Sequence, residues 1–159
     1  IFFKAHKFHG DSKNYHSPVN SYINTVLESK KGNPLSICLL YSIIAQSLDL
    51  PIYGVNLPNH FVLAYIDTRG SGAMINEENE FGVLCYINAF SNGVIFNTNE
   101  IKQFLDELKL PHRREYFEPC SNSAIIKRML NNLISSFQRV GNSEKVEELT
   151  LLRNIIQGN

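Results

Sequence analysis

Four side chains in this sequence have the chemistry of a nucleophilic site: Ser36, Cys38, His60 and Asn88. A hydroxyl or a thiol becomes a nucleophile when a base takes its proton, and histidine commonly acts as that base. An amide such as that of Asn88 can fix the tautomer of the imidazole, as in the Cys-His-Asn arrangement of papain-like enzymes. A cysteine- or serine-type hydrolase or acyl-transferase is therefore one function that these residue types allow.

Each of these side chains also has a structural interpretation. Cys38 lies one turn inside an apolar helix, where the helix dipole has faded and a thiol behaves as a small buried hydrophobe. Ser36 is in the first turn of that helix, where a hydroxyl commonly bonds to nearby backbone. Strand alternation places His60 on the same face as Val62 and Ala64, either in the core or at a cleft. The pattern favours the structural interpretation for both nucleophile candidates and leaves His60 open.

Two amides flank the histidine. Asn56 and Asn59 could line a cleft and donate to the carbonyl of a ligand. Turn formation around Pro58 is the simpler explanation for both.

Proline-marked helix starts and short β-branched runs must position these residues. Ser17-Pro18 and Asn33-Pro34 each combine a capping side chain with a proline that tolerates the first helical position. The apolar periodicity predicts helices over residues 17–31, 33–48 and 98–108. Strands are expected over 52–56, 60–66, 83–88 and 94–96, with 67–82 as a hairpin loop.

The last forty residues have a different pattern. Two amphipathic helices, over 123–139 and 143–157, are joined at Gly141, and the first carries an apolar stripe that includes Ile126. An antiparallel helical hairpin that packs on the core is expected. We therefore predict an α+β fold with a buried central helix on an antiparallel sheet, divided into a core over residues 1–118 and a helical annex over 119–159.

Composition restricts the partners. The 159 residues include 15 basic and 15 acidic side chains, so no net charge favours nucleic acid or an anionic membrane. Three cysteines without metal-like spacing indicate free thiols in a reducing cytosol, and neither a metal nor a cofactor is expected. No apolar run has the length of a membrane span. The chain begins with Ile1 rather than methionine, so we expect a domain of a longer protein.

Several runs in the sequence resemble one family. They are residues 20–28, 32–36 (Gly-Asn-Pro-Leu-Ser), 54–61 (ending Pro-Asn-His-Phe), 87–93 and 128–133 (Arg-Met-Leu-Asn-Asn-Leu). In this order they are similar to the SirB-type branch of the transglutaminase-like superfamily. The resemblance implies a papain-like α+β core followed by tetratricopeptide-like helices.

The resemblance also assigns positions to the chemistry. Enzymes of this superfamily have Gly-x-Cys at the start of the central helix, and Gly32-Asn33-Pro34 matches that segment, so that Pro34 occupies the place of the nucleophile. His60 matches the family histidine, and Asn88 lies where an aspartate would orient it.

Three functions remain open from the sequence. The first is a non-catalytic domain that keeps a cleft around His60 and binds a peptide or protein partner. The second is an enzyme that recruits Ser36 or Cys38 as the nucleophile, with His60 as the base and Asn88 as the orienting group. The third is a structural or regulatory role inside a larger protein.

Overall fold

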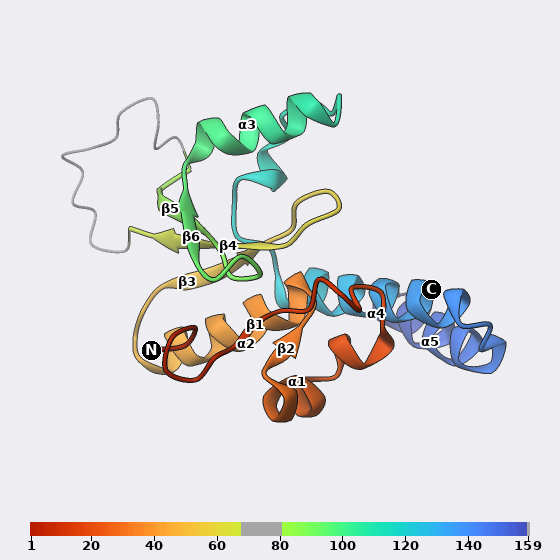
Figure 1. Ribbon diagram of the computed structural model, residues 1–159. Coiled ribbons are helices and arrows are strands. Elements are labelled where there is room, and N and C mark those ends of the chain that lie inside the picture. Colours follow the sequence, from red (N-terminus) through yellow and green to blue (C-terminus); the bar gives the residue numbers. More distant parts are fainter. Residues whose placement is uncertain (68–80, 159) are drawn as a thin grey trace.

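The computed structural model describes residues 1–67 and 81–158 and shows an α+β fold built around one antiparallel sheet (Figure 1). The strands of this sheet follow one another in chain order: β3 (Ile52–Val55), β4 (Val62–Ile66), β5 (Val83–Asn88) and β6 (Val94–Phe96). The predicted fold class is therefore confirmed. The loop expected over residues 67–82 falls almost wholly outside the described residues.

Helices precede and follow the sheet along the chain. Before the sheet come η1 (Pro18–Ser21), α1 (Ile23–Ser29) and α2 (Pro34–Ser47). After it come α3 (Thr98–Glu107), η3 (Arg114–Tyr116), α4 (Asn122–Arg139) and α5 (Ser143–Gln157). Two short segments, β1 (His9–Gly10) and β2 (Lys31–Gly32), form a separate parallel pair.

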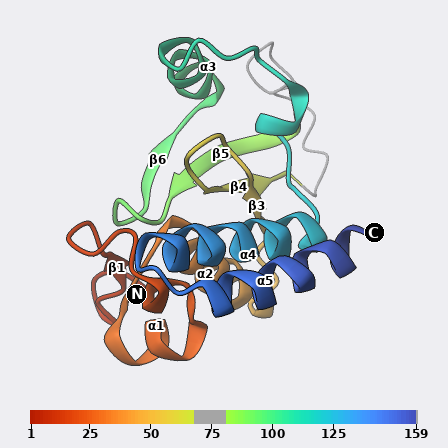
Figure 2. The ribbon, with the colours of Figure 1, turned by 90° about the vertical axis from the view of Figure 1, so that its right-hand side faces the viewer.

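Alternation along the strands divides the core into two layers. Leu63 and Ile87, paired between β4 and β5, face α2 and pack with its buried side chains. Their neighbours Val62, Ala64 and Tyr86 face the other way and pack with α3. Figures 1 and 2 accordingly show the sheet between α3 on one side and α2 on the other. This arrangement follows from the period of two along a strand.

The first predicted helix is interrupted. The structure has a 3-10 turn and a short α-helix, because Tyr22 between them is extended, with φ −87° and ψ 114°. The break leaves the carbonyl of Asn20 free to accept hydrogen bonds from the backbone of Asn33 at 3.2 Å and from the hydroxyl of Ser36 at 2.6 Å. A long-range contact therefore overrides the local helical pattern.

The two C-terminal helices form the predicted hairpin, with α4 and α5 side by side in Figure 2. Helix α4 packs on the core through Ile125, with Met129 against the same cluster, and its residues Leu130, Leu133 and Ile134 are also buried. Ile126, which the predicted stripe included, is 47% exposed instead. The proposed boundary between residues 118 and 119 stays a prediction.

Candidate functional site

The start of α2 is held by a dense set of hydrogen bonds. Asn33 caps the helix: its side-chain oxygen accepts from the backbone N–H of Ser36 at 2.9 Å, and its amide nitrogen donates to the hydroxyl of Ser21 at 2.8 Å. Both partners are buried. A cap of this kind satisfies one of the free N–H groups in the first helical turn.

Pro34 is the first residue of α2 and lines a cavity beside this cap. Its pyrrolidine ring suits the first helical position, where an N–H group would have no partner within the helix. The ring also removes two groups that an acyl-transfer site needs. Pro34 offers no side-chain nucleophile, and it has no backbone N–H to stabilise an oxyanion.

Ser36 points into the protein. Its hydroxyl donates to the carbonyl of Asn20 at 2.6 Å, with a second contact of 3.2 Å to the carbonyl of Asn33, and the residue is 1% exposed. Gly32 makes room for it, because a Cβ atom at that position would lie 2.4 Å from the Ser36 oxygen. The hydroxyl thus ties the helix start to the preceding turn.

Cys38 lies in the layer of the core between α2 and the sheet. It is 0% exposed, and its Sγ lies 3.4 Å from the carbonyl oxygen of Phe61. Burial raises the pKa of the thiol to about 12. At neutral pH the group is therefore a protonated thiol, whereas the thiolate is the nucleophilic form.

His60 and Asn88 are brought together by the sheet. Asn88 ends β5, and its side-chain oxygen also accepts from the backbone of Ser91 at 3.1 Å. Burial lowers the pKa of the His60 imidazole, the side chain of Asn88 acts in the opposite direction, and the charge of Arg128 lowers the pKa further. The imidazole is therefore neutral at pH 7.

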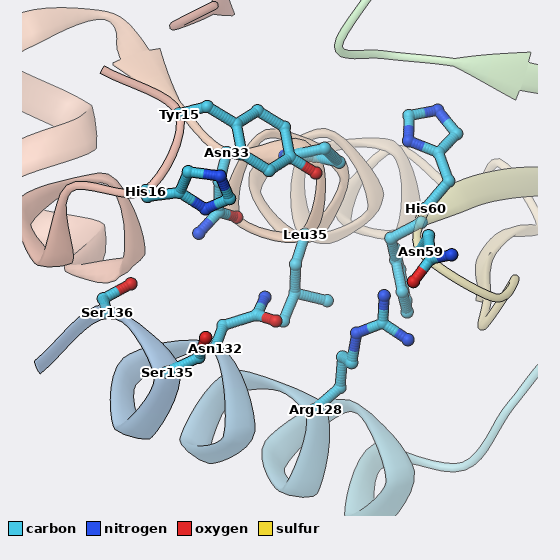
Figure 3. Close-up of a pocket in the computed structure, with 12 residues that line it drawn as sticks. Tyr15, His16, Asn33, Leu35, Asn59, His60, Arg128, Asn132, Ser135 and Ser136 are labelled. Carbon is cyan, nitrogen blue, oxygen red and sulfur yellow. The ribbon is translucent and has the colours of Figure 1, made fainter. Parts of the chain in front are cut away.

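A cavity of about 320 Å³ lies between the start of α2, the turn before β4 and helix α4. Figure 3 shows Leu35 at its centre, His60 and Asn59 on one side, Tyr15 and His16 on the other, and α4 below. Asn59 adopts a left-handed backbone conformation, with φ 57°, in the turn that presents His60. Asn56, by contrast, is not among the described residues that line this cavity.

Helix α4 contributes a cation to the cavity. The Nη1 of Arg128 donates to the side-chain oxygen of Asn56 at 3.1 Å and to the carbonyl of Leu57 at 3.3 Å. The guanidinium is partly buried, which lowers the pKa of Arg128. An arginine keeps its charge under any such shift, because its reference pKa is so high. The site therefore carries a permanent positive charge.

A second cavity, of about 380 Å³, lies on the α3 side of the same histidine. His60 and Asn88 line it together with Ser91, Glu100 and apolar side chains from the strands, α3 and the turn before β4: Leu57, Val62, Val94, Phe96, Ile101 and Phe104. His60 thus lines both cavities, and the second has more apolar side chains in its lining than the first.

The described residues show no group of three or more His, Cys, Asp or Glu side chains that could hold a metal ion. All three cysteines are free thiols. Within residues 1–67 and 81–158, no helix combines the length and the apolar character needed to cross a bilayer.

Several residues that line the first cavity are not singled out by the sequence, among them Tyr15, His16, Arg128 and Asn132. The first two lie in an irregular segment without periodicity. The other two lie on a helix assigned to a separate annex, about 70 positions from His60. One feature of the sequence could have indicated a site on this helix: the charged residue Arg128 lies between the apolar positions Ile125 and Leu130, which are buried.

Comparison with known proteins agrees with this architecture. The chain is 29% identical over 142 residues to human F-box only protein 21, and the match covers 89% of this chain and 21% of that protein. It is 29% identical over 141 residues to a UPF0162 protein of Haemophilus influenzae, covering 84% of this chain and 50% of that protein. A UPF0162 protein of Pasteurella multocida is 37% identical over 76 residues, or 48% of this chain and 28% of that protein.

The chain thus spans about a fifth of the F-box relative and at most about half of these UPF0162 relatives. No solved structure matches it significantly. The family model described as the transglutaminase-like superfamily matches residues 1–131. The resemblance expected from the sequence motifs is confirmed, and the chain belongs to the transglutaminase-like superfamily.

Proposed function

We propose that this chain is a non-catalytic transglutaminase-fold domain that binds a peptide segment of a partner protein in the cleft around His60. The observation that carries the proposal is the position of Pro34. The residue lines the cavity at the start of the central helix, where the superfamily resemblance expects the nucleophile, and it has neither a reactive side chain nor an N–H group.

The two neighbouring candidates support the proposal. The hydroxyl of Ser36 and the thiol of Cys38 both contact backbone carbonyls inside the protein. A general base must lie within hydrogen-bond reach of the proton that it takes. Neither side chain is bonded to His60 in the described part of the chain.

The lining of the first cavity suits a peptide. The side chains of Asn59, Asn132 and Ser135 supply both donors and acceptors, which match the amide and carbonyl groups of an extended backbone. Leu35 and Phe61 add apolar surface between them. Cavities with mostly fixed walls and a few convergent polar groups are typical binding sites.

A hydrolase or acyl-transferase that uses Ser36 or Cys38 is the second candidate. The closeness of His60 and Asn88, which line one cavity, favours it, since the amide of Asn88 could orient an imidazole base. It would require either nucleophile to leave its buried position. The raised pKa of Cys38 makes this costly for the thiol.

Activity probes can separate the two candidates. The protein would be treated at pH 7.2 with a thiol-directed probe and with a fluorophosphonate, and labelling would be mapped by peptide mass spectrometry. We expect no labelling of Ser36, and labelling of Cys38 only after denaturation in urea. Rapid labelling of either residue that is lost in His60→Ala would overturn the non-catalytic assignment.

Binding can be tested separately from catalysis. A pool of random, uncharged hexapeptides with blocked ends would be titrated into ¹⁵N-labelled protein. We expect the backbone signals of Leu35, Asn59 and Asn132 to shift, because these residues line the cavity. Shifts confined to other surfaces would place the binding site elsewhere and contradict the proposal.

The relatives fit a module of this kind. The match occupies a fraction of each longer protein, about a fifth of human F-box only protein 21. A binding domain embedded in a longer chain would also serve the regulatory role considered above. We further propose a cytoplasmic location, because free thiols persist in a reducing compartment.

A further inference from the structure

The wall that α4 gives to the first cavity is polar and carries one charge. Arg128, Asn132 and Ser135 line the cavity from successive turns of the helix. Residues at this spacing share one face of a helix. In Figure 3, Arg128 extends towards Asn59 and His60, and Asn132 extends towards Leu35.

Only one of the nitrogen atoms of the Arg128 guanidinium donates hydrogen bonds within the described part of the chain. Its Nη1 is bonded to Asn56 and Leu57, which fixes the plane of the group against the turn before His60. Among the described residues, Nε and Nη2 have no hydrogen-bond partner. A guanidinium that is held through Nη1 can offer its Nε and Nη2 donors to a planar acceptor group such as a carboxylate.

The positive charge has no counter-ion in the described part of the chain. The ion pairs found there involve His112, Arg113, Arg114 and Lys145, and none includes Arg128. No aspartate or glutamate is among the described residues that line the cavity. A partly buried charge without a partner carries a desolvation cost, which an anionic occupant would offset.

We propose that this cavity binds a carboxylate group of a peptide, held by Arg128 with Asn132 and Ser135 as additional donors. The inference rests on the proposed function and names the chemical group that the cleft recognises. The carboxylate could come from the C-terminus of a chain or from a glutamate side chain, because both present the same planar pair of oxygens.

The charge of the cavity favours a carboxylate over a phosphate. Tyr15, His16 and His60 are the other titratable side chains that line it, and His60 is neutral at pH 7. Arg128 is therefore the single permanent cation of the described lining. One guanidinium balances the single charge of a carboxylate, whereas a phosphate monoester carries nearly two.

Three small probes and one ion test the proposal. Acetyl-Gly-Gly with a free carboxylate, its C-terminal amide, acetyl-Glu-amide and inorganic phosphate would each be titrated into ¹⁵N-labelled protein at constant ionic strength. The readout is the Nε–Hε signal of Arg128 together with the backbone signals of Leu35 and Asn132. We expect saturable shifts with a carboxylate probe, and at least tenfold weaker binding of the neutral amide.

A matched pair of variants tests the residues. Asn132→Asp would place a carboxylate one helical turn from Arg128 and inside the cavity, so we expect it to weaken probe binding at least tenfold. Asn131→Asp adds the same charge on the exposed part of α4, where Asn131 accepts from Arg153 at 3.3 Å, and should leave binding unchanged. Both substitutions are nearly isosteric, so the fold should be retained, and circular dichroism would check this.

The outcomes are distinct. Shifts with the free acid alone assign a C-terminal carboxylate, and shifts with acetyl-Glu-amide as well extend the site to side chains; either result supports the proposal. Equal binding of acid and amide would overturn the carboxylate inference and leave the peptide-binding proposal intact. Phosphate binding tighter than that of both carboxylate probes would also overturn it. No shift at the cavity with any peptide, including the uncharged pool, would overturn both.

Discussion

His60, two residues before β4, and Asn88, the last residue of β5, line the same cavity on the α3 side of the sheet. The register of the sheet pairs Leu63 with Ile87, and this pairing brings His60 and Asn88 to the same end of the two adjacent strands. His60 also lines the polar cavity beside Pro34. An orienting group is thus present beside a histidine that has no nucleophile bonded to it in the described part of the chain.

Asn88→Asp should raise the pKa of His60. A carboxylate in place of the amide favours the protonated imidazole through its charge. The measurement is an NMR titration of the His60 Cε1–H signal in the wild type and the variant. Asn92→Asp adds the same charge to the exposed turn after β5 and serves as the control. An equal shift in both variants would mean that Asn88 does not contact the ring.

His60 should make the folded protein less stable in mild acid. Its pKa is lower in the folded state than the ordinary value of 6.5 that applies after unfolding. Between these two values the unfolded chain binds more protons, so the free energy of unfolding falls as the pH decreases from about 7. The fall ends below the pKa of the folded state.

Urea denaturation between pH 7.5 and pH 5 would measure this dependence. We expect a flatter profile in His60→Gln than in the wild type. His6→Gln, which replaces an exposed histidine, is the control for the substitution itself. A wild-type profile that does not decline towards pH 5 would show that burial of His60 costs nothing.

The cap of the central helix should contribute more to stability than an exposed cap. Asn33→Ala removes the bond to the N–H of Ser36 and leaves the buried hydroxyl of Ser21 without that donor. We expect a loss of about 1–3 kcal/mol in the free energy of unfolding. Asn97→Ala removes the exposed cap of α3, where Glu100 completes a capping box, and should cost about 1 kcal/mol. Equal losses in the free energy of unfolding of the two variants would show that the buried hydrogen bonds of Asn33 add no stability beyond that of an exposed cap.

Pro34→Cys should give a reactive thiol where the wild type has none. The new side chain would lie in the first turn of α2, a position that lowers a thiol pKa. Pro34 is buried but lines the cavity, so a small reagent would have to reach the thiol from the cavity. Iodoacetamide should modify it at least tenfold faster than Cys38, which provides an internal reference in the same protein. Peptide mass spectrometry would separate the two sites from Cys85 and Cys120. Labelling as slow as that of Cys38 would mean that the cavity does not admit the reagent.

Much of the fold could be predicted because its signals are local. Asn33-Pro34 marks the start of α2, and the predicted helix over 33–48 agrees with the observed Pro34–Ser47. Short β-branched runs likewise predict the strands β3 to β6 to within one or two residues. The helix predicted over 17–31 is interrupted at Tyr22, because hydrogen bonds from Asn33 and Ser36 to the carbonyl of Asn20 outweigh the helical pattern there.

The site was harder to predict because it combines distant segments. His60, Asn59 and Pro34 were singled out from motifs, and each lines the cavity. Arg128 bonds to Asn56 across 72 positions, and no periodicity reports a contact of that range. The helical pattern gave Arg128 a place on α4 but not the orientation of α4 against the core.

Pro34, at the start of α2, lacks two chemical groups at once: a nucleophilic side chain and a backbone N–H group. The backbone there already has the helical geometry that a cysteine would need, and the cap, the glycine before it and the histidine opposite are all in place. A cysteine at position 34 would therefore supply both a backbone N–H group and a thiol to the cleft, with no change to the other residues that line it. Position 34 decides by itself whether a thiol is present at the start of the central helix.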